Sequence, residues 1–184
     1  MKRTLSIVLV ILIMICSVLS FSSCKKDKIP DIPLGYQFFP YYNVSFAYPS
    51  DWFVTQQDGV IVVMNPTGKG TNITFSYEIK TTLYENTTPD EFYELMKPNY
   101  EAVGGEISNV QIEKKTTNNV DVVCITYDTL MESGPMKQHL FVTTYEDLTY
   151  SVTVTVVGED DSIVDTVFST LHIRSTWDMI KDLL

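Results

Sequence analysis

Alternation of apolar and polar side chains is the feature of this sequence that most restricts its fold. The clearest example runs from Ile73 to Ile79, where Ile, Phe, Tyr and Ile alternate with Thr, Ser and Glu. Successive side chains of a β-strand point to opposite faces of a sheet, so this pattern predicts a strand with one buried face. Similar stretches recur along the chain and are joined by turn residues such as Asp58-Gly59 and Asn118-Asn119. Strands joined by such short loops pair antiparallel.

The first predicted strand runs from Asn43 to Tyr48. Its period of two places Val44, Phe46 and Tyr48 on the core face and the residues between them on the solvent face. The next predicted strand starts at Trp52.

Two helices interrupt the predicted strands. Thr88-Pro89-Asp90-Glu91 has the pattern of a capping box, with proline at the first helical position. Pro98 predicts that this helix kinks or ends early. A second helix is expected after Ser162, whose hydroxyl is the predicted N-cap. The predicted buried face of the first helix consists of Phe92, Leu95, Met96, Tyr100 and Val103.

About eight strands, with helices after the fourth and the eighth, predict an α+β fold. We expect an antiparallel β-sheet sandwiched between helices.

The first 23 residues have the features of a secretory signal peptide. Lys2 and Arg3 precede an uncharged stretch of 15 residues, and small residues follow it. Phe21-Ser22-Ser23-Cys24 resembles the lipobox of bacterial lipoproteins, in which the cysteine is acylated and becomes the new N-terminus, although Phe21 stands where leucine is usual. An uncleaved anchor and a signal peptide cut elsewhere are the alternatives. The apolar stretch is shorter than the roughly 20 residues that a spanning helix needs.

The chain therefore divides into four segments. Residues 1–23 are the predicted lipoprotein signal peptide, and residues 24–35 are a lipid-anchored tether that Pro30 and Pro33 keep extended. Residues 36–174 form the α+β domain, and residues 175–184 are a C-terminal tail or short helix. We expect the domain on the extracytoplasmic side of the bacterial cell membrane, held there by lipid on Cys24.

The net charge restricts the partners. The whole chain carries a formal charge of −10, and loss of Lys2 and Arg3 with the signal peptide leaves −12. A domain this acidic repels phosphate backbones, so we expect no nucleic-acid partner.

An aromatic stretch follows the tether: Tyr36, Phe38, Phe39, Tyr41 and Tyr42. Packing within the domain is the usual outcome for such a cluster, and docking of a partner is the alternative.

Few residues carry chemistry. A hairpin turn at Ser133-Gly134 would place His139 opposite Asp128 and leave the Cys124 thiol about 13 Å from the imidazole, too far for a nucleophile and its base. We therefore expect Cys124 to be packed and His139 to pair with Asp128 at the surface. A hydrolase would need His139, Asp128 and a serine or threonine in one pocket.

Neither a metal nor a cofactor is expected. The two histidines and the one thiol left in the mature chain are too few for a zinc site. Glu159-Asp160-Asp161 lacks the ligand spacing of a calcium loop and is interpreted as a solvated turn before a helix. His172 is expected to cap the C-terminus of that last helix.

The order of elements resembles that of PsbP-like domains. The resemblance rests on Phe46-Ala47-Tyr48-Pro49-Ser50-Asp51-Trp52, on the helix start Thr88-Pro89-Asp90-Glu91-Phe92, and on the ending Phe168-Ser169-Thr170-Leu171-His172-Ile173. It covers roughly Tyr36 to Arg174. It implies an antiparallel sheet between helices and no enzyme activity, because members mostly act as binding or assembly factors. Their ligands differ, so no functional residue is transferred.

These observations favour a membrane-anchored, non-catalytic module that binds a partner protein or an envelope ligand. An accessory subunit of a membrane complex is the alternative, and an uncharacterised hydrolase is the third hypothesis.

Overall fold

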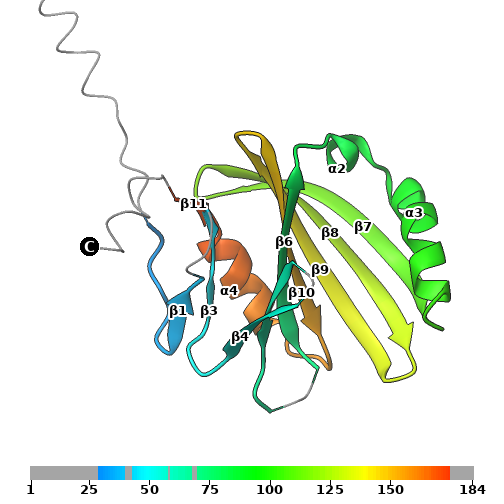
Figure 1. Cartoon of the computed structure of the whole chain (residues 1–184), viewed down its shortest axis with the longest axis horizontal. Coiled ribbons are helices and arrows are strands. Elements are labelled where there is room, and N and C mark those ends of the chain that lie inside the picture. The colour runs from blue at the N-terminus through cyan, green and yellow to red at the C-terminus, as the bar shows by residue number, and fades with distance from the viewer. Residues whose placement is uncertain (1–28, 40–42, 58, 68–69, 175–184) are drawn as a thin grey trace, which may run out of the picture.

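The computed structural model describes residues 29–39, 43–57, 59–67 and 70–174 (Figure 1). The predicted signal peptide, Cys24, Tyr41, Tyr42 and the tail 175–184 lie outside these ranges. Among the described residues, no helix is both long and apolar enough to cross a membrane.

A seven-stranded antiparallel sheet forms the centre of the domain, in the order β4-β5-β6-β10-β9-β8-β7. Its strands are β4 (Phe53–Gln57), β5 (Val60–Met64), β6 (Asn72–Ile79), β7 (Glu106–Thr117), β8 (Val120–Met131), β9 (Gly134–Tyr145) and β10 (Leu148–Val156). The helices are α2 (Leu83–Asn86), α3 (Pro89–Glu101) and α4 (Ser162–Thr170). Two further pairs are β1 (Tyr36–Phe38) with β3 (Ala47–Pro49) and β2 (Val44–Ser45) with β11 (His172–Ile173).

Helices α3 and α4 cover opposite faces of the sheet (Figure 1). The larger core lies on the α4 side, where Phe75, Val152 and Val167 are almost fully buried. The smaller core lies on the α3 side and includes Phe92 and Ile125. The predicted fold class, an antiparallel sheet between helices, is therefore confirmed.

The predicted strand Asn43–Tyr48 is wrong in detail. The chain forms two short strands here, β2 and β3, and every residue from Val44 to Tyr48 is buried. Both faces are covered because this segment lies between other elements. β2 pairs with β11, and the backbone N–H of Ala47 donates to the Thr170 hydroxyl of α4 at 2.8 Å. An alternating pattern of apolar and polar residues predicts one buried face, and it cannot predict that other elements also cover the second face.

The capping box is confirmed. The Thr88 hydroxyl accepts from the Glu91 N–H, and the Glu91 carboxylate accepts from the Thr88 N–H at 2.8 Å. The helix passes through Pro98 and ends at Glu101, so the early end is wrong. Pro98 falls in the last turn, so the one hydrogen bond it cannot make to Glu94 and the clash of its ring there affect only the end of α3.

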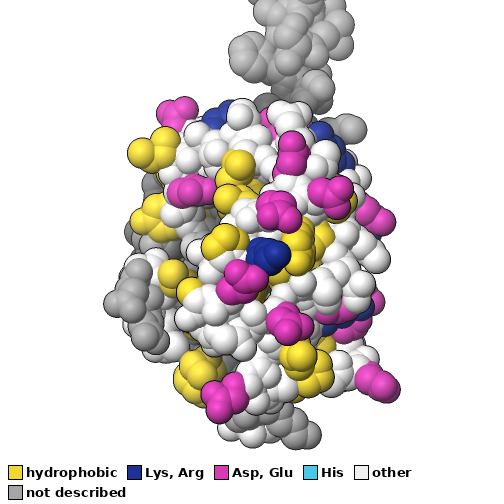
Figure 2. Space-filling model, turned by 90° about the vertical axis from the view of Figure 1, so that its right-hand side faces the viewer, with side chains coloured by type: hydrophobic (Ala, Val, Ile, Leu, Met, Phe, Trp, Pro, Cys, Tyr) yellow, Lys and Arg dark blue, Asp and Glu magenta, His cyan; other side chains and the backbone are white. Residues whose placement is uncertain are grey.

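Helix α3 buries a narrower stripe than predicted. Phe92 is its one buried residue, and Leu95 is 47% exposed. Val103, which the sequence placed on the same face, is 64% exposed and lies beyond the end of the helix. The reason is that α3 packs along β7, which is an edge strand, rather than across the middle of the sheet. Figure 2 shows this side of the domain, where acidic side chains are spread over the surface and hydrophobic ones are scattered among them.

Three other differences are local. Helix α2 was not predicted, because four residues are too few for a helical period to be recognised. The sequence indicated about eight strands, whereas the described residues form eleven, four of them only two or three residues long. Strands β2 and β3 both arise from one predicted strand. The outer half of β6 is not buried, since Ile79 is 84% exposed beyond the core.

Candidate functional site

The described aromatic residues after the tether pack against the domain itself. Phe39 is fully buried, and its ring stacks on Phe46 with 4.7 Å between centroids. Tyr36 and Phe38 are half-buried, and Phe38 meets the ring of His172 edge-on at 4.9 Å. Phe39 belongs to the core and is not available to a partner. Docking through Tyr36 and Phe38 stays a prediction.

The hairpin between β8 and β9 turns one residue earlier than predicted. Met131 pairs with Gly134, so Glu132 and Ser133 form the turn. Gly134 has a φ of +115°, a conformation that glycine adopts without strain, and it begins the return strand instead of forming the turn. Each residue of β8 therefore faces a partner two positions away from the predicted one.

This register corrects the predicted geometry of Cys124 and His139. Cys124 faces Phe141, and His139 faces Thr126. The thiol and the imidazole are diagonal neighbours on one face of the sheet, with Cα atoms roughly 7 Å apart instead of about 13 Å. The predicted pair of His139 with Asp128 is also wrong, because Asp128 faces Lys137 and accepts a hydrogen bond from Asn109 at 2.7 Å.

A cleft of about 340 Å³ opens between α4 and strands β7–β9, and His139 lines it. Alternate residues of β8 and β9 form its floor, and side chains of α4 form its opposite wall. The residues that matter for its chemistry are Cys124, Thr126, Lys137, His139, Phe141 and Asp161.

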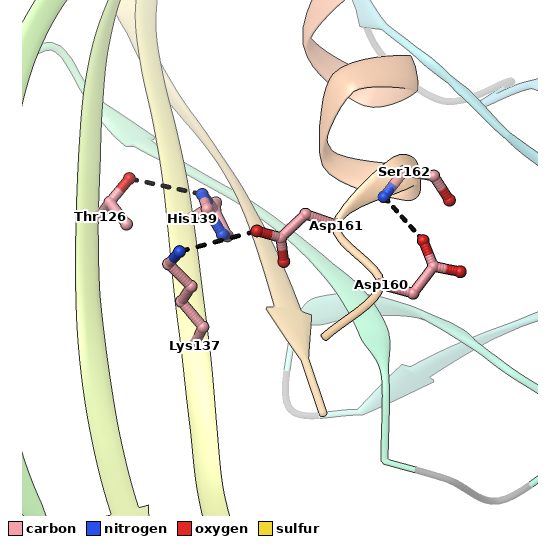
Figure 3. Close-up of polar contacts among 6 residues, drawn as sticks. All are labelled: Thr126, Lys137, His139, Asp160, Asp161 and Ser162. Atoms are coloured by element: carbon pink, nitrogen blue, oxygen red, sulfur yellow. Dashed lines mark hydrogen bonds and ion pairs between the residues drawn. The ribbon is translucent and has the colours of Figure 1, made fainter. Parts of the chain in front are cut away.

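The imidazole of His139 is the unusual group in this cleft. Its Nδ1 lies 3.4 Å from the Thr126 hydroxyl oxygen. Its Nε2 is buried and has no hydrogen-bond partner among the described residues. Figure 3 shows the ring pointing toward α4, with the Lys137–Asp161 pair beside it. Burial is the main cause that lowers the pKa of His139 below its ordinary value, so the neutral ring is the form present at pH 7.

Charged pairs stand at the edges of the cleft. Lys137 and Asp161 approach within 3.6 Å, and Lys115 and Glu113 within 2.6 Å. All four side chains are partly exposed, so each pair contributes little to stability. A further carboxylate, that of Asp165 on α4, also lines the cleft and acts electrostatically on the His139 imidazole.

The cleft contains no activated nucleophile of the kind a Cys-His pair provides. Burial raises the pKa of the Cys124 thiol to about 11, so the thiolate is scarce at neutral pH. Thr126 does approach His139, but no carboxylate of the described residues hydrogen bonds to the imidazole. The third member of the hydrolase cluster, Asp128, bonds to Asn109 instead.

The remaining candidates have structural roles. Asp160 accepts from the Ser162 N–H at 3.0 Å, and Ser162 is the first residue of α4, so the predicted Ser162 cap is wrong. His172 Nδ1 lies 2.8 Å from the Thr170 carbonyl and donates to the last residue of α4, as expected of a residue at the helix C-terminus. No group of three or more His, Cys, Asp or Glu side chains within the described ranges could hold a metal ion.

Sequence reasoning missed Thr126, Lys137 and Asp161 as members of one site. The first two lie on adjacent strands, and Asp161 comes from the N-cap of α4. The Ser133-Gly134 sequence was compatible with the observed turn, because a glycine can follow a hairpin turn as well as form part of it. Placing the turn one residue earlier brings Thr126 opposite His139.

Comparisons with known proteins identify the fold alone. No protein-family model matches the chain, and no curated protein matches its sequence. Among solved structures, the cyanobacterial PsbP (CyanoP) of Synechocystis sp. PCC 6803 aligns with a TM-score of 0.61 and 19% identity, over 79% of this chain and 97% of that one. The domain has a PsbP-like fold.

Another structure shares this PsbP-like fold. A protein of Bacteroides thetaiotaomicron VPI-5482 aligns with a TM-score of 0.54 and 18% identity, over 78% of this chain. The alignment spans half of the Bacteroides chain. The Saccharomyces cerevisiae Ran-binding protein Mog1p aligns with a TM-score of 0.45 and 9% identity, over 79% of this chain and 98% of its own. A match at that level supports no inference about function.

Proposed function

We propose that this protein is a lipid-anchored binding module on the extracytoplasmic side of a bacterial membrane, without catalytic activity. Its PsbP-like domain would hold a small envelope ligand in the cleft beneath α4. The anchor rests on the lipobox-like Phe21-Ser22-Ser23-Cys24 and on the apolar stretch before it. The binding role rests on the cleft.

One observation carries the binding proposal: the buried, unpartnered Nε2 of His139 in a 340 Å³ cleft. A buried polar atom without a partner costs about 1–3 kcal/mol, so a molecule that reaches Nε2 and supplies a hydrogen bond there gains at most that amount. Clefts of this size are typical of small-ligand sites.

The walls beside the imidazole indicate the ligand's chemistry. The rings of Phe141 and Phe168 lie 5.5 Å apart by their centroids and give the cleft an apolar side. The lysines at the edge are already paired with acids, and Asp165 of α4 adds a further carboxylate to the lining, so the cleft disfavours an anionic group. The expected ligand is a small molecule with an apolar part and one uncharged hydrogen-bonding group.

The same residues support a non-catalytic role. Burial keeps the Cys124 thiol protonated, and no hydrogen bond joins it to the His139 imidazole among the described contacts, so the two do not form an activated nucleophile and base. Binding of a ligand requires neither a nucleophile nor a base.

The test is a thermal-shift screen of the full-length protein, extracted in detergent, against sugars, amino acids and fragments of envelope lipids. We expect at least one compound to raise the melting temperature of the wild type and to lose this effect in His139→Phe, which keeps a ring but removes both nitrogens. Tyr127→Phe is the matched control, because it removes one polar atom from a buried ring on the other side of the sheet. Hits that stabilise His139→Phe equally, or no hits at all, would refute the cleft as a binding site.

Without ligand, the wild type and His139→Phe should also differ in how their free energy of unfolding depends on pH. The unfolded chain binds a proton at His139 near pH 6.5, whereas the folded chain binds it only at lower pH. The stability contributed by the neutral ring is therefore complete above pH 6.5 and is lost as the pH falls from there through the folded pKa. Denaturant titrations should show the wild type losing more stability than His139→Phe over this range.

The anchor has a separate test. Intact mass of the protein extracted from membranes should correspond to a chain that begins at Cys24 and carries acyl groups on it. Cys24→Ser should leave the protein without acylation and change its fractionation. A mature chain of unmodified mass would contradict the lipoprotein assignment and leave the cleft proposal standing.

A further inference from the structure

The sheet divides between β8 and β9 at one end. The two strands pair from the turn at Met131 and Gly134 as far as Val123 and Val142, and no further. Beyond that point each strand continues with its other neighbour: β8 stays paired with β7 up to Val120, and β9 stays paired with β10 up to Tyr145. We call this opening the fork. It is formed by residues 120–122 of β8 and 143–145 of β9.

At the fork, backbone groups of β8 and β9 face each other without the hydrogen bonds of a β-ladder. Asn118-Asn119 is a two-residue turn with positive φ at both positions, so Thr117 and Val120 close the β7–β8 hairpin as a hydrogen-bonded pair. In an antiparallel ladder such pairs alternate, so the backbone N–H and C=O of the next residue, Asp121, point toward β9. On β9, the residue that alternates with Val142 is Thr144. Asp121 and Thr144 are the next pair of the ladder, and they are not paired.

A side chain partly closes this gap. The Thr143 hydroxyl donates to the backbone C=O of Asp121 at 2.9 Å. This contact satisfies the carbonyl but does not engage the Asp121 N–H, which points in the same direction. The fork is therefore held by one side-chain bond where a continuous sheet would have backbone bonds.

A cavity of about 490 Å³ lies at the fork. Val123 and Val142 give it an apolar floor, and Tyr84 of α2 stands across from them. Lys114 lies at its edge, exposed, and forms no ion pair with any described residue. The volume lies in the range of peptide and small-ligand sites.

We propose that the fork binds an extended segment of a partner polypeptide, which adds a short strand to the separated ends of β8 and β9. The incoming backbone bonds to Asp121 and Thr144, and one apolar side chain rests on Val123 and Val142. Strand addition is a common mode of peptide recognition, in which main-chain hydrogen bonds supply affinity and pockets for alternate side chains supply specificity. The Thr143–Asp121 bond is the contact that the segment replaces. This site is distinct from the cleft beneath α4, although Lys115 lines both.

The experiment uses a random heptapeptide library displayed on phage and panned against the full-length wild-type protein in detergent, and the selected peptides are then measured against Asp121→Pro. Proline removes the N–H that faces the fork and spares the β7 ladder, to which Asp121 contributes no bond. Asp121→Ala is the matched control, because it removes the same carboxylate and keeps the N–H. We expect synthetic copies of the selected peptides to bind wild type and Asp121→Ala alike and Asp121→Pro about tenfold more weakly, as expected for one lost hydrogen bond.

Two further measurements address the mechanism. Thr143→Val removes the competing hydroxyl at similar volume and should tighten peptide binding. Methylation of the peptide's backbone nitrogens should abolish binding, because strand addition depends on those N–H groups. Circular dichroism of each variant checks that it folds. Selected peptides that bind Asp121→Pro equally or tolerate N-methylation, or a library that yields no peptide, would overturn the proposal.

Discussion

Replacing Phe39 by alanine should lower the free energy of unfolding by about 3–5 kcal/mol, which is usual for a buried phenylalanine. The Phe39 ring is fully buried between Phe46 and Phe75, with centroids 4.7 Å and 4.9 Å away. Truncation leaves a cavity among side chains that cannot move into it without losing their own contacts. Denaturant titration measures the change.

Tyr36→Ala is the comparison for this result. Tyr36 belongs to the same aromatic stretch but is half-buried at the start of β1, so its truncation should cost less. If the stretch served mainly to dock a partner, both substitutions would leave stability unchanged and weaken association instead. A stable Phe39→Ala protein would therefore contradict the core assignment.

Replacing Thr170 by valine should destabilise the domain by about 1–3 kcal/mol, although the two side chains are nearly isosteric. The Thr170 hydroxyl accepts from the backbone N–H of Ala47 at 2.8 Å and donates to the Thr166 carbonyl at 2.6 Å. Ala47 is fully buried, so its N–H has no access to water once the hydroxyl is gone. Thermal or denaturant unfolding should show the loss.

Thr166→Val is the matched control. Thr166 also lies on α4 and donates to the Ser162 carbonyl at 3.1 Å, but it does so at the surface, where water can replace the hydroxyl. Its replacement should change stability by a few tenths of a kcal/mol. Equal effects at the two positions would mean that the bond to Ala47 does not hold β3 to the helix.

Local patterns predicted the elements whose physics is local. Thr88 and Glu91 form a capping box because each group lies within reach of the other in the first turn of a helix. Asn118 and Asn119 turn the chain because asparagine tolerates positive φ, and the order of such elements indicated a sheet between helices.

The candidate site could not be predicted in the same way. Whether His139 faces Asp128 or Thr126 depends on which two residues form the turn between β8 and β9. Moving this turn by one residue changes every pair along the hairpin. Asp161 joins the site from another element, so no spacing in the sequence links it to Lys137.

The sequence by itself determined the longer strands, the two longer helices and the sheet between them, because hydrophobic period, capping and turn chemistry act between near neighbours. Tertiary structure alone decided which of those residues meet. It buried both faces of the segment from Val44 to Tyr48, left His139 Nε2 without a partner, and divided β8 from β9 above Val123. Each of these results depends on contacts between residues that are distant in the chain. The packing of the whole domain determines these contacts, and the local sequence of a single segment does not.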